Sequence, residues 1–175
     1  AADSGSPGNV AAETAADAGP EAPVRTLTDT LVATMKAAED LGFDGRADKL
    51  GPVLRGTFDF GFMARLSLGA QWGKLDAAEQ ARFTDLFARM SIATFAARFD
   101  GYSGQHVEVQ TAREGPRGTK LVPTELVHPD PDKAPVTISY LMRETESGWQ
   151  AVDVYLKGTY SELATKRSEY TSIVK

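Results

Sequence analysis

The hydrophobic pattern of the chain changes its period once, close to Gln105. Between Thr26 and Phe99, apolar residues recur every three to four positions, which is the spacing of helices with one buried face. From Gln105 to Leu156, apolar and polar residues alternate, as they do along strands with one buried face. A polar segment after Gly158 again has helical spacing. The pattern predicts an α+β fold in which helices come first, strands follow and a helix closes the chain.

The first half predicts helices at 26–42 and 58–69, a short helix at 45–54 that is interrupted at Gly51-Pro52, and a long helix from 76 to about 100. Asp76 and Glu79 match a capping box at the start of the long helix. The second half predicts four strands, which are separated by turn-rich segments and lie at 106–112, 120–128, 136–142 and 149–156. Because short connections favour antiparallel neighbours, we expect a four-stranded antiparallel sheet.

The first 24 residues differ in composition from the rest. They are dominated by Ala, Gly, Pro, Ser and acidic residues, and such a segment has too little apolar surface to offset the entropy of ordering. We therefore expect a disordered leader at 1–24 and a single domain at 25–175. The chain starts at Ala1 rather than Met, which fits either a mature form after removal of an export signal or a recloned start.

Composition narrows the class of protein. The net charge of −5 argues against binding to nucleic acid and against binding to anionic membranes through a polybasic segment. The chain has no cysteine, which excludes disulfides and cysteine-bound zinc. The longest apolar stretches are broken by Arg65, Arg89 and Arg98, so we expect no transmembrane segment.

The sequence contains no recognisable catalytic or nucleotide-binding motif. His106 and His128 lack partners at metal-ligand spacing, and we interpret them as surface residues. Asp153 is unusual because it lies in the middle of an apolar strand. A carboxylate in such a place needs partners, so we expect it to be partly buried and bound by backbone amides or an arginine.

Apolar residues are crowded in the segment from Phe58 to Leu68. Phe60 and Phe62 point about 200° apart on a helix, so this segment must be covered on several sides. Either an ordinary core or the wall of a cavity would provide that cover, and periodicity does not separate the two.

Three segments resemble one known family. "TFDFGFMARLSLG" with its F-x-x-R core, "ARFDGYSG" and the closing GW-x-x-x-DVYL-x-G-T-x-SELA-x-x-RSEY occur in the order and spacing of the MlaC (toluene-tolerance) family, and in particular of its hopanoid-associated HpnM subgroup. The resemblance extends from about Thr26 to Val174. It implies an NTF2-like or cystatin-like fold, in which helices wrap a curved antiparallel sheet and lipid tails insert between them.

The resemblance also implies a function. Members of this family carry lipids across the periplasm between an inner-membrane transporter and the outer membrane. We therefore expect a monomeric, periplasmic, non-enzymatic carrier without a cofactor, whose ligand is a hopanoid or a phospholipid. Its expected partners are an inner-membrane lipid transporter and an outer-membrane acceptor.

The expected cavity residues come from the most apolar helices and from the more apolar alternation of each strand. A register error of one residue would exchange the two faces of a strand. The helical set is Phe62, Met63, Leu66, Phe87 and Met90, and the strand set is Val109, Val122, Ile138, Tyr140, Val152, Val154 and Tyr155.

Two alternatives stay open at this point. An NTF2-like small enzyme would use Asp153 with Tyr140 or Tyr155 in the same pocket, and a pocket carboxylate with a raised pKa would favour it. An interaction module of a transport complex that binds no lipid would lack a cavity altogether.

Overall fold

The computed structural model of the chain describes residues 18–157 and 160–173. Within these residues the fold is α+β, as the sequence predicts. The helices are α1 (Glu21–Lys36), α2 (Ala38–Thr57), α3 (Phe60–Leu68), α4 (Ala77–Arg98) and α5 (Glu162–Ile173), with short 3₁₀ turns at Gly69–Lys74 and Pro116–Gly118. The strands are β1 (His106–Val109), β2 (Arg113–Glu114), β3 (Lys120–Val127), β4 (Val136–Thr145), β5 (Gly148–Leu156) and β6 (Tyr160–Ser161).

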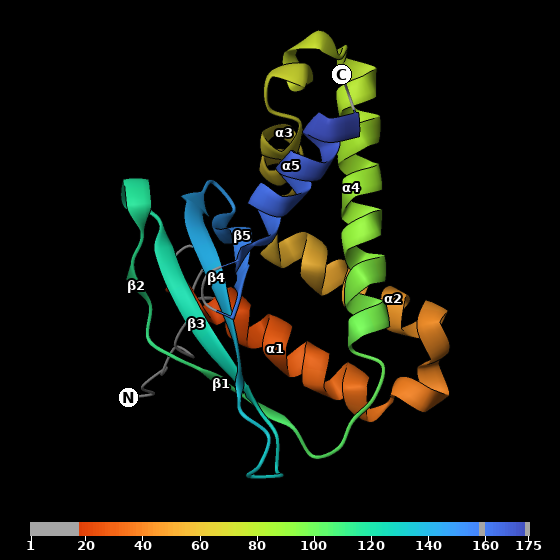
Figure 1. The fold of residues 1–175 in the computed structure, drawn as a ribbon, viewed down its shortest axis with the longest axis vertical. Coiled ribbons are helices and arrows are strands. Elements are labelled where there is room, and N and C mark those ends of the chain that lie inside the picture. Colours follow the sequence, from red (N-terminus) through yellow and green to blue (C-terminus); the bar gives the residue numbers. More distant parts are fainter. Residues whose placement is uncertain (1–17, 158–159, 174–175) are drawn as a thin grey trace, which may run out of the picture.

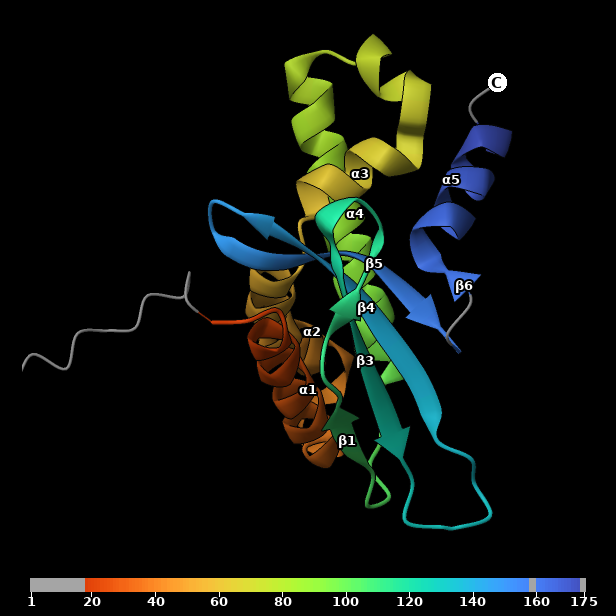
Figure 2. The same ribbon diagram turned by 90° about the vertical axis from the view of Figure 1, so that its left-hand side faces the viewer.

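The strands form one antiparallel sheet in the order β1-β3-β4-β5-β6, and β2 pairs with β3. The four long strands are the four that alternation predicts, whereas β2 and β6 are two-residue additions too short to produce a pattern. The helices gather on one side of the sheet (Figure 1). Turned by 90°, the same structure shows the strands with α4 behind them (Figure 2).

A bulge in β5 changes which residues share a face. Leu141 pairs with Asp153 but Met142 pairs with Ala151, so Val152 is the extra residue on β5. Tyr140 pairs with Val154 beyond the bulge. Because Tyr140 and Met142 share a face of β4, Ala151 and Val154 share the matching face of β5, although three positions separate them. Bulges of this kind also bend the strand and increase its twist.

The helices before the sheet divide at other points than the sequence predicts. The helix expected at 26–42 ends at Lys36, and α2 starts at Ala38 after a break at Ala37. Gly42 then kinks α2 with a φ of 61°, a value that favours glycine. No interruption occurs at Pro52, because burial of the residues on either side of it offsets the cost of the amide hydrogen bond that proline lacks. These two residues, Leu50 and Leu54, are fully buried.

Helix α1 begins earlier than the predicted domain boundary. It starts at Glu21, and Val24 is fully buried in the core. The Glu21 carboxylate accepts a hydrogen bond of 2.8 Å from the Ala112 amide, and this bond lowers the pKa of Glu21. Residues 21–24, which the sequence analysis assigned to the leader, therefore belong to the folded domain. Residues 1–17 lie outside the described residues.

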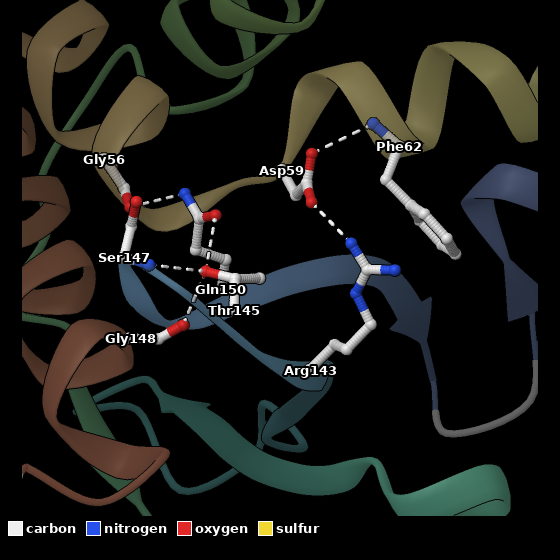
Figure 3. A network of polar contacts seen from close by, with 8 residues as sticks. All are labelled: Gly56, Asp59, Phe62, Arg143, Thr145, Ser147, Gly148 and Gln150. Carbon is white, nitrogen blue, oxygen red and sulfur yellow. Dashed lines mark hydrogen bonds and ion pairs between the residues drawn. The ribbon is translucent and has the colours of Figure 1, made fainter. Parts of the chain in front are cut away.

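The junction of α2 and α3 is fixed to the sheet by polar contacts (Figure 3). Asp59 caps α3, accepting a hydrogen bond from the Phe62 amide at 2.9 Å, and its other carboxylate oxygen accepts one from Arg143 at 2.7 Å. The Arg143 guanidinium lies 3.9 Å from the centre of the Phe62 ring. The sequence predicted that Phe58 would be helical. Its backbone instead forms a bridge to Ala151 of β5. At the start of α4, the predicted capping box is confirmed.

Candidate ligand-binding cavity

A cavity of about 630 Å³ lies between α3, α4, α5 and the β4–β5 part of the sheet. This volume falls within the range of pockets that hold small organic ligands. Every element around the cavity contributes apolar side chains to its wall. These are Phe58 from the junction of α2 and α3, Phe60 and Met63 on α3, Phe87 and Phe95 on α4, Phe99 directly after α4, Val136, Ile138 and Tyr140 on β4, Val154 and Leu156 on β5, and Leu163 on α5.

Aromatic rings form a connected part of this wall. The Phe58 ring lies 5.6 Å from Phe60, 5.9 Å from Phe95 and 6.2 Å from Tyr140, measured between ring centres. Phe95 in turn stacks on Phe99 at 5.8 Å. Rings in such contact hold one another in place. Because Phe58 is also fixed to β5 by its backbone bridge, this side of the cavity is pre-formed.

One margin of the cavity is polar. Ser91, Thr94 and Arg98 line it from α4, and Glu162, Thr165, Lys166 and Glu169 line it from α5. We call these seven residues the polar edge. Arg98 Nη2 lies 3.7 Å from Glu162 Oε1, which links the two helices by an ion pair. The cavity is thus amphipathic, with an apolar wall of aromatic and aliphatic side chains and a charged margin between α4 and α5.

The structure brings five of the predicted cavity residues to its wall, namely Met63, Phe87, Ile138, Tyr140 and Val154. They come from both predicted sides, α3 and α4 on one and β4 and β5 on the other. The remaining predicted residues lie elsewhere, for reasons that differ between helices and strands.

The misplaced helical residues result from the phase of each helix. The buried face of α3 consists of Phe60, Met63, Ala64 and Ser67, so Phe62 turns away to lie beneath Arg143. Leu66 is partly buried against the core outside the cavity. On α4, Met90 faces outward and is 41% exposed.

The misplaced strand residues lie in the filled core, in the bulge or on the other face. Val122 is fully buried on β3, and Val109 packs against the core from β1. Val152 is the bulge residue of β5. Tyr155 pairs with Ser139, on the face opposite Tyr140 and Val154.

Sequence reasoning missed part of the apolar wall and the whole polar edge. Phe95 lies about two turns after Phe87 on α4 and Phe99 follows four positions later at its C-cap, so helical spacing could have identified these two as well as Phe87. Phe58 and Phe60 were obscured because the segment was interpreted as one continuous helix. The polar edge has no signal in the sequence beyond ordinary helical spacing.

Asp153 caps α5 rather than serving the cavity. One carboxylate oxygen accepts hydrogen bonds from the Val154 amide at 2.8 Å and the Leu163 amide at 3.1 Å, and the other accepts one from the Ser161 hydroxyl. The expectation that Asp153 is buried and bound by backbone amides is confirmed. These contacts fix the first turn of α5, which forms one side of the cavity.

The acid and tyrosines of the enzyme alternative do not meet in the cavity. Asp153 and Tyr155 share the sheet face opposite Tyr140, as their pairing with Leu141 and Ser139 shows. Burial raises the pKa of Tyr140, and burial together with the charge of Asp153 raises the pKa of Tyr155. Both phenols are therefore held protonated, and of the three side chains only that of Tyr140 lines the cavity.

Within residues 18–157 and 160–173, no group of three His, Cys, Asp or Glu side chains could hold a metal ion. In the same part of the chain, no helix has the length and apolar character needed to cross a membrane.

Fold and cavity together define an α+β protein that has room for an apolar ligand between its helices and its sheet. Comparison with protein families names the group: the chain belongs to the MlaC family, because the family described as MlaC protein matches residues 25–175. No curated protein matches the chain.

A solved structure from Ralstonia solanacearum has the same fold. It is the phospholipid-binding protein of that organism in complex with a phospholipid, and it matches with a TM-score of 0.77 and 20% identity. The match covers 90% of this chain and 88% of the other. At 20% identity, this structural similarity establishes the fold of the chain and nothing about its ligand.

Proposed function

We propose that this protein is a lipid carrier that holds the apolar part of a lipid in the cavity. The observation that carries the proposal is the cavity itself, about 630 Å³ of space with a largely aromatic and aliphatic wall and a charged margin. Such a site matches a molecule with an apolar body and a polar head.

Physical chemistry explains why a carrier needs only this. Exposing the roughly thirty apolar carbons of a lipid to water costs a transfer free energy of roughly 20 kcal/mol, at about 0.8 kcal/mol per methylene group. A cavity that removes this surface from water makes transfer through an aqueous compartment feasible. Such a carrier only has to bind and release the lipid, so it requires no catalytic group.

Two lipid classes follow from different observations. The sequence motifs resemble the hopanoid-associated subgroup and favour a hopanoid, whereas the Ralstonia structure contains a phospholipid. The apolar wall suits either class, since apolar contacts are not directional.

The proposed setting is the periplasm. Membership of the MlaC family supports a carrier that shuttles between an inner-membrane transporter and an outer-membrane acceptor. Under this proposal the precursor carries an export signal and the native protein appears in the periplasmic fraction. Recovery from the cytosolic fraction without a cleaved segment would remove the shuttle mechanism.

The test of lipid binding is mass spectrometry of an organic extract of the purified protein. We expect about one lipid molecule per protein molecule, and the mass identifies a hopanoid or a phospholipid. Delipidated protein should take up lipid again from vesicles. Absence of lipid in the extract together with no uptake from vesicles of either lipid class would contradict the proposal.

A further inference from the structure

The four charged residues of the polar edge are balanced in sign. Arg98 and Lys166 supply two positive charges, and Glu162 and Glu169 supply two negative charges. All four line the same cavity, although the chain as a whole carries a net charge of −5. The edge therefore differs from the rest of the molecule in its charge balance.

Helical spacing brings these charges together. Glu162, Lys166 and Glu169 lie at positions i, i+4 and i+7 of α5, which share one face of a helix. Arg98, at the end of α4, completes the set through its contact with Glu162. The Lys166 ammonium lies 5.9 Å from the centre of the Phe87 ring, above the apolar wall.

These charges are available to a ligand. The Arg98 and Glu162 side chains are 54% and 30% exposed, and their 3.7 Å separation is long for an ion pair. Ion pairs of this exposure contribute little to the stability of the fold. Arg98 and Glu162 can therefore exchange each other for charged groups of a ligand at little cost in stability.

We propose, as an extension of the proposed function, that the polar edge selects lipids whose head group carries both a phosphate and an ammonium. Arg98 and Lys166 bind the phosphate, because guanidinium and ammonium groups are the usual protein donors to phosphate oxygens. Glu162 and Glu169 accept hydrogen bonds from the ammonium. The acyl chains then extend along the apolar wall toward Tyr140.

The same charges act against other head groups. A purely anionic head group that reaches Arg98 and Lys166 also meets the carboxylates of Glu162 and Glu169, which repel it. An uncharged head group satisfies neither pair. Selectivity of this kind arises from unfavourable contacts with the wrong ligand as much as from favourable contacts with the right one.

A competition between two phospholipids tests the proposal. Delipidated protein is incubated with vesicles that contain equal amounts of phosphatidylethanolamine and phosphatidylglycerol with identical acyl chains, and mass spectrometry measures the ratio bound. We expect phosphatidylethanolamine to be enriched roughly fivefold over its share in the vesicle. This ratio in the unmodified protein requires no variant to fold.

Variants then assign the selectivity to the polar edge. The double substitution Glu162→Gln with Glu169→Gln should bring the bound ratio close to that of the vesicle. The double substitution Arg98→Gln with Lys166→Gln should reduce the uptake of both lipids. A matched control removes two carboxylates from the β4–β5 hairpin, outside the cavity (Glu144→Gln with Glu146→Gln), and should keep the original ratio.

The outcomes separate this inference from the proposed function. Equal uptake of the two phospholipids, or an unchanged ratio in the Glu162→Gln, Glu169→Gln variant, overturns head-group selection but leaves the carrier intact. Preferential uptake of an uncharged hopanoid from a mixed vesicle does the same. Failure to take up any of these lipids overturns the carrier itself.

Discussion

At the scale of single residues, Asp153 links the sheet to the cavity. Its carboxylate accepts hydrogen bonds from two backbone amides and one hydroxyl, and the Leu163 amide and Ser161 hydroxyl belong to the start of α5 and the strand before it. Leu163 is the buried residue of α5 and lines the cavity. The position of one cavity wall therefore depends on a carboxylate on the opposite face of the sheet.

Removing the charge of Asp153 should loosen α5. For Asp153→Asn we expect a decrease of about 1–3 kcal/mol in the free energy of unfolding, because one buried acceptor is lost and the capping bonds weaken. Urea unfolding measures the loss, and hydrogen exchange of the Leu163 and Ala164 amides locates it. The exposed Asp132→Asn serves as the control. Equal stability and equal amide protection in the two variants would contradict the capping role.

The sequence predicted the environment of Asp153 but not its partners. An ionised group in an apolar strand must be hydrogen-bonded, so burial and amide contacts followed from its position alone. The Leu163 donor lies ten positions further along the chain, and no local pattern indicated that it would contact Asp153. The sequence thus indicated that Asp153 needs hydrogen-bond donors, and the tertiary fold determines which groups supply them.

At the scale of elements, the sequence predicted the type of each long element and misplaced several of their ends. The start of α1 is a clear case, because the Ala- and Pro-rich composition before Arg25 resembles that of the preceding segment. Burial of Val24 and the bond from Ala112 to Glu21 make this turn part of the domain. Such contacts link distant parts of the chain and leave no local pattern.

Truncation tests where the domain starts. Two chains are compared, one that begins at Ala18 and one that begins at Arg25. We expect the shorter chain to be less stable by about 2–4 kcal/mol, since it loses a buried valine side chain and a charge-assisted hydrogen bond. Chemical denaturation of both chains measures the difference. Identical unfolding midpoints would place the boundary at residue 25 after all.

At the scale of the whole molecule, the sequence predicted that α3, α4, β4 and β5 face a cavity and identified five of its residues, but it also assigned β1 and β3 to the cavity wall and named no residue of α5. Two local irregularities determine which residues of α3 and β5 face the cavity. The Asp59 cap sets the start of α3, and the bulge at Val152 shifts the alternation of β5. Periodicity also does not distinguish a filled core from an open cavity. Val122 and Val154 both pair with Tyr140, yet only Val154 borders the cavity.

This pair of valines provides the sharpest test of a lipid-holding cavity. In Val122→Trp, the larger ring has no space, and overpacking should cost about 1–3 kcal/mol or more of stability. In Val154→Trp, the ring can occupy the cavity, so the delipidated protein should keep its fold. Melting curves of the two delipidated variants establish that only the second is suitable for measuring bound lipid.

The deciding measurement is the amount of lipid recovered per mole of folded Val154→Trp protein, relative to the unmodified protein. If the cavity between α3, α4, α5 and the sheet holds the lipid, the recovered amount falls sharply while the melting curve is retained. Unchanged lipid content in a folded Val154→Trp protein would contradict the account and place the ligand outside this cavity.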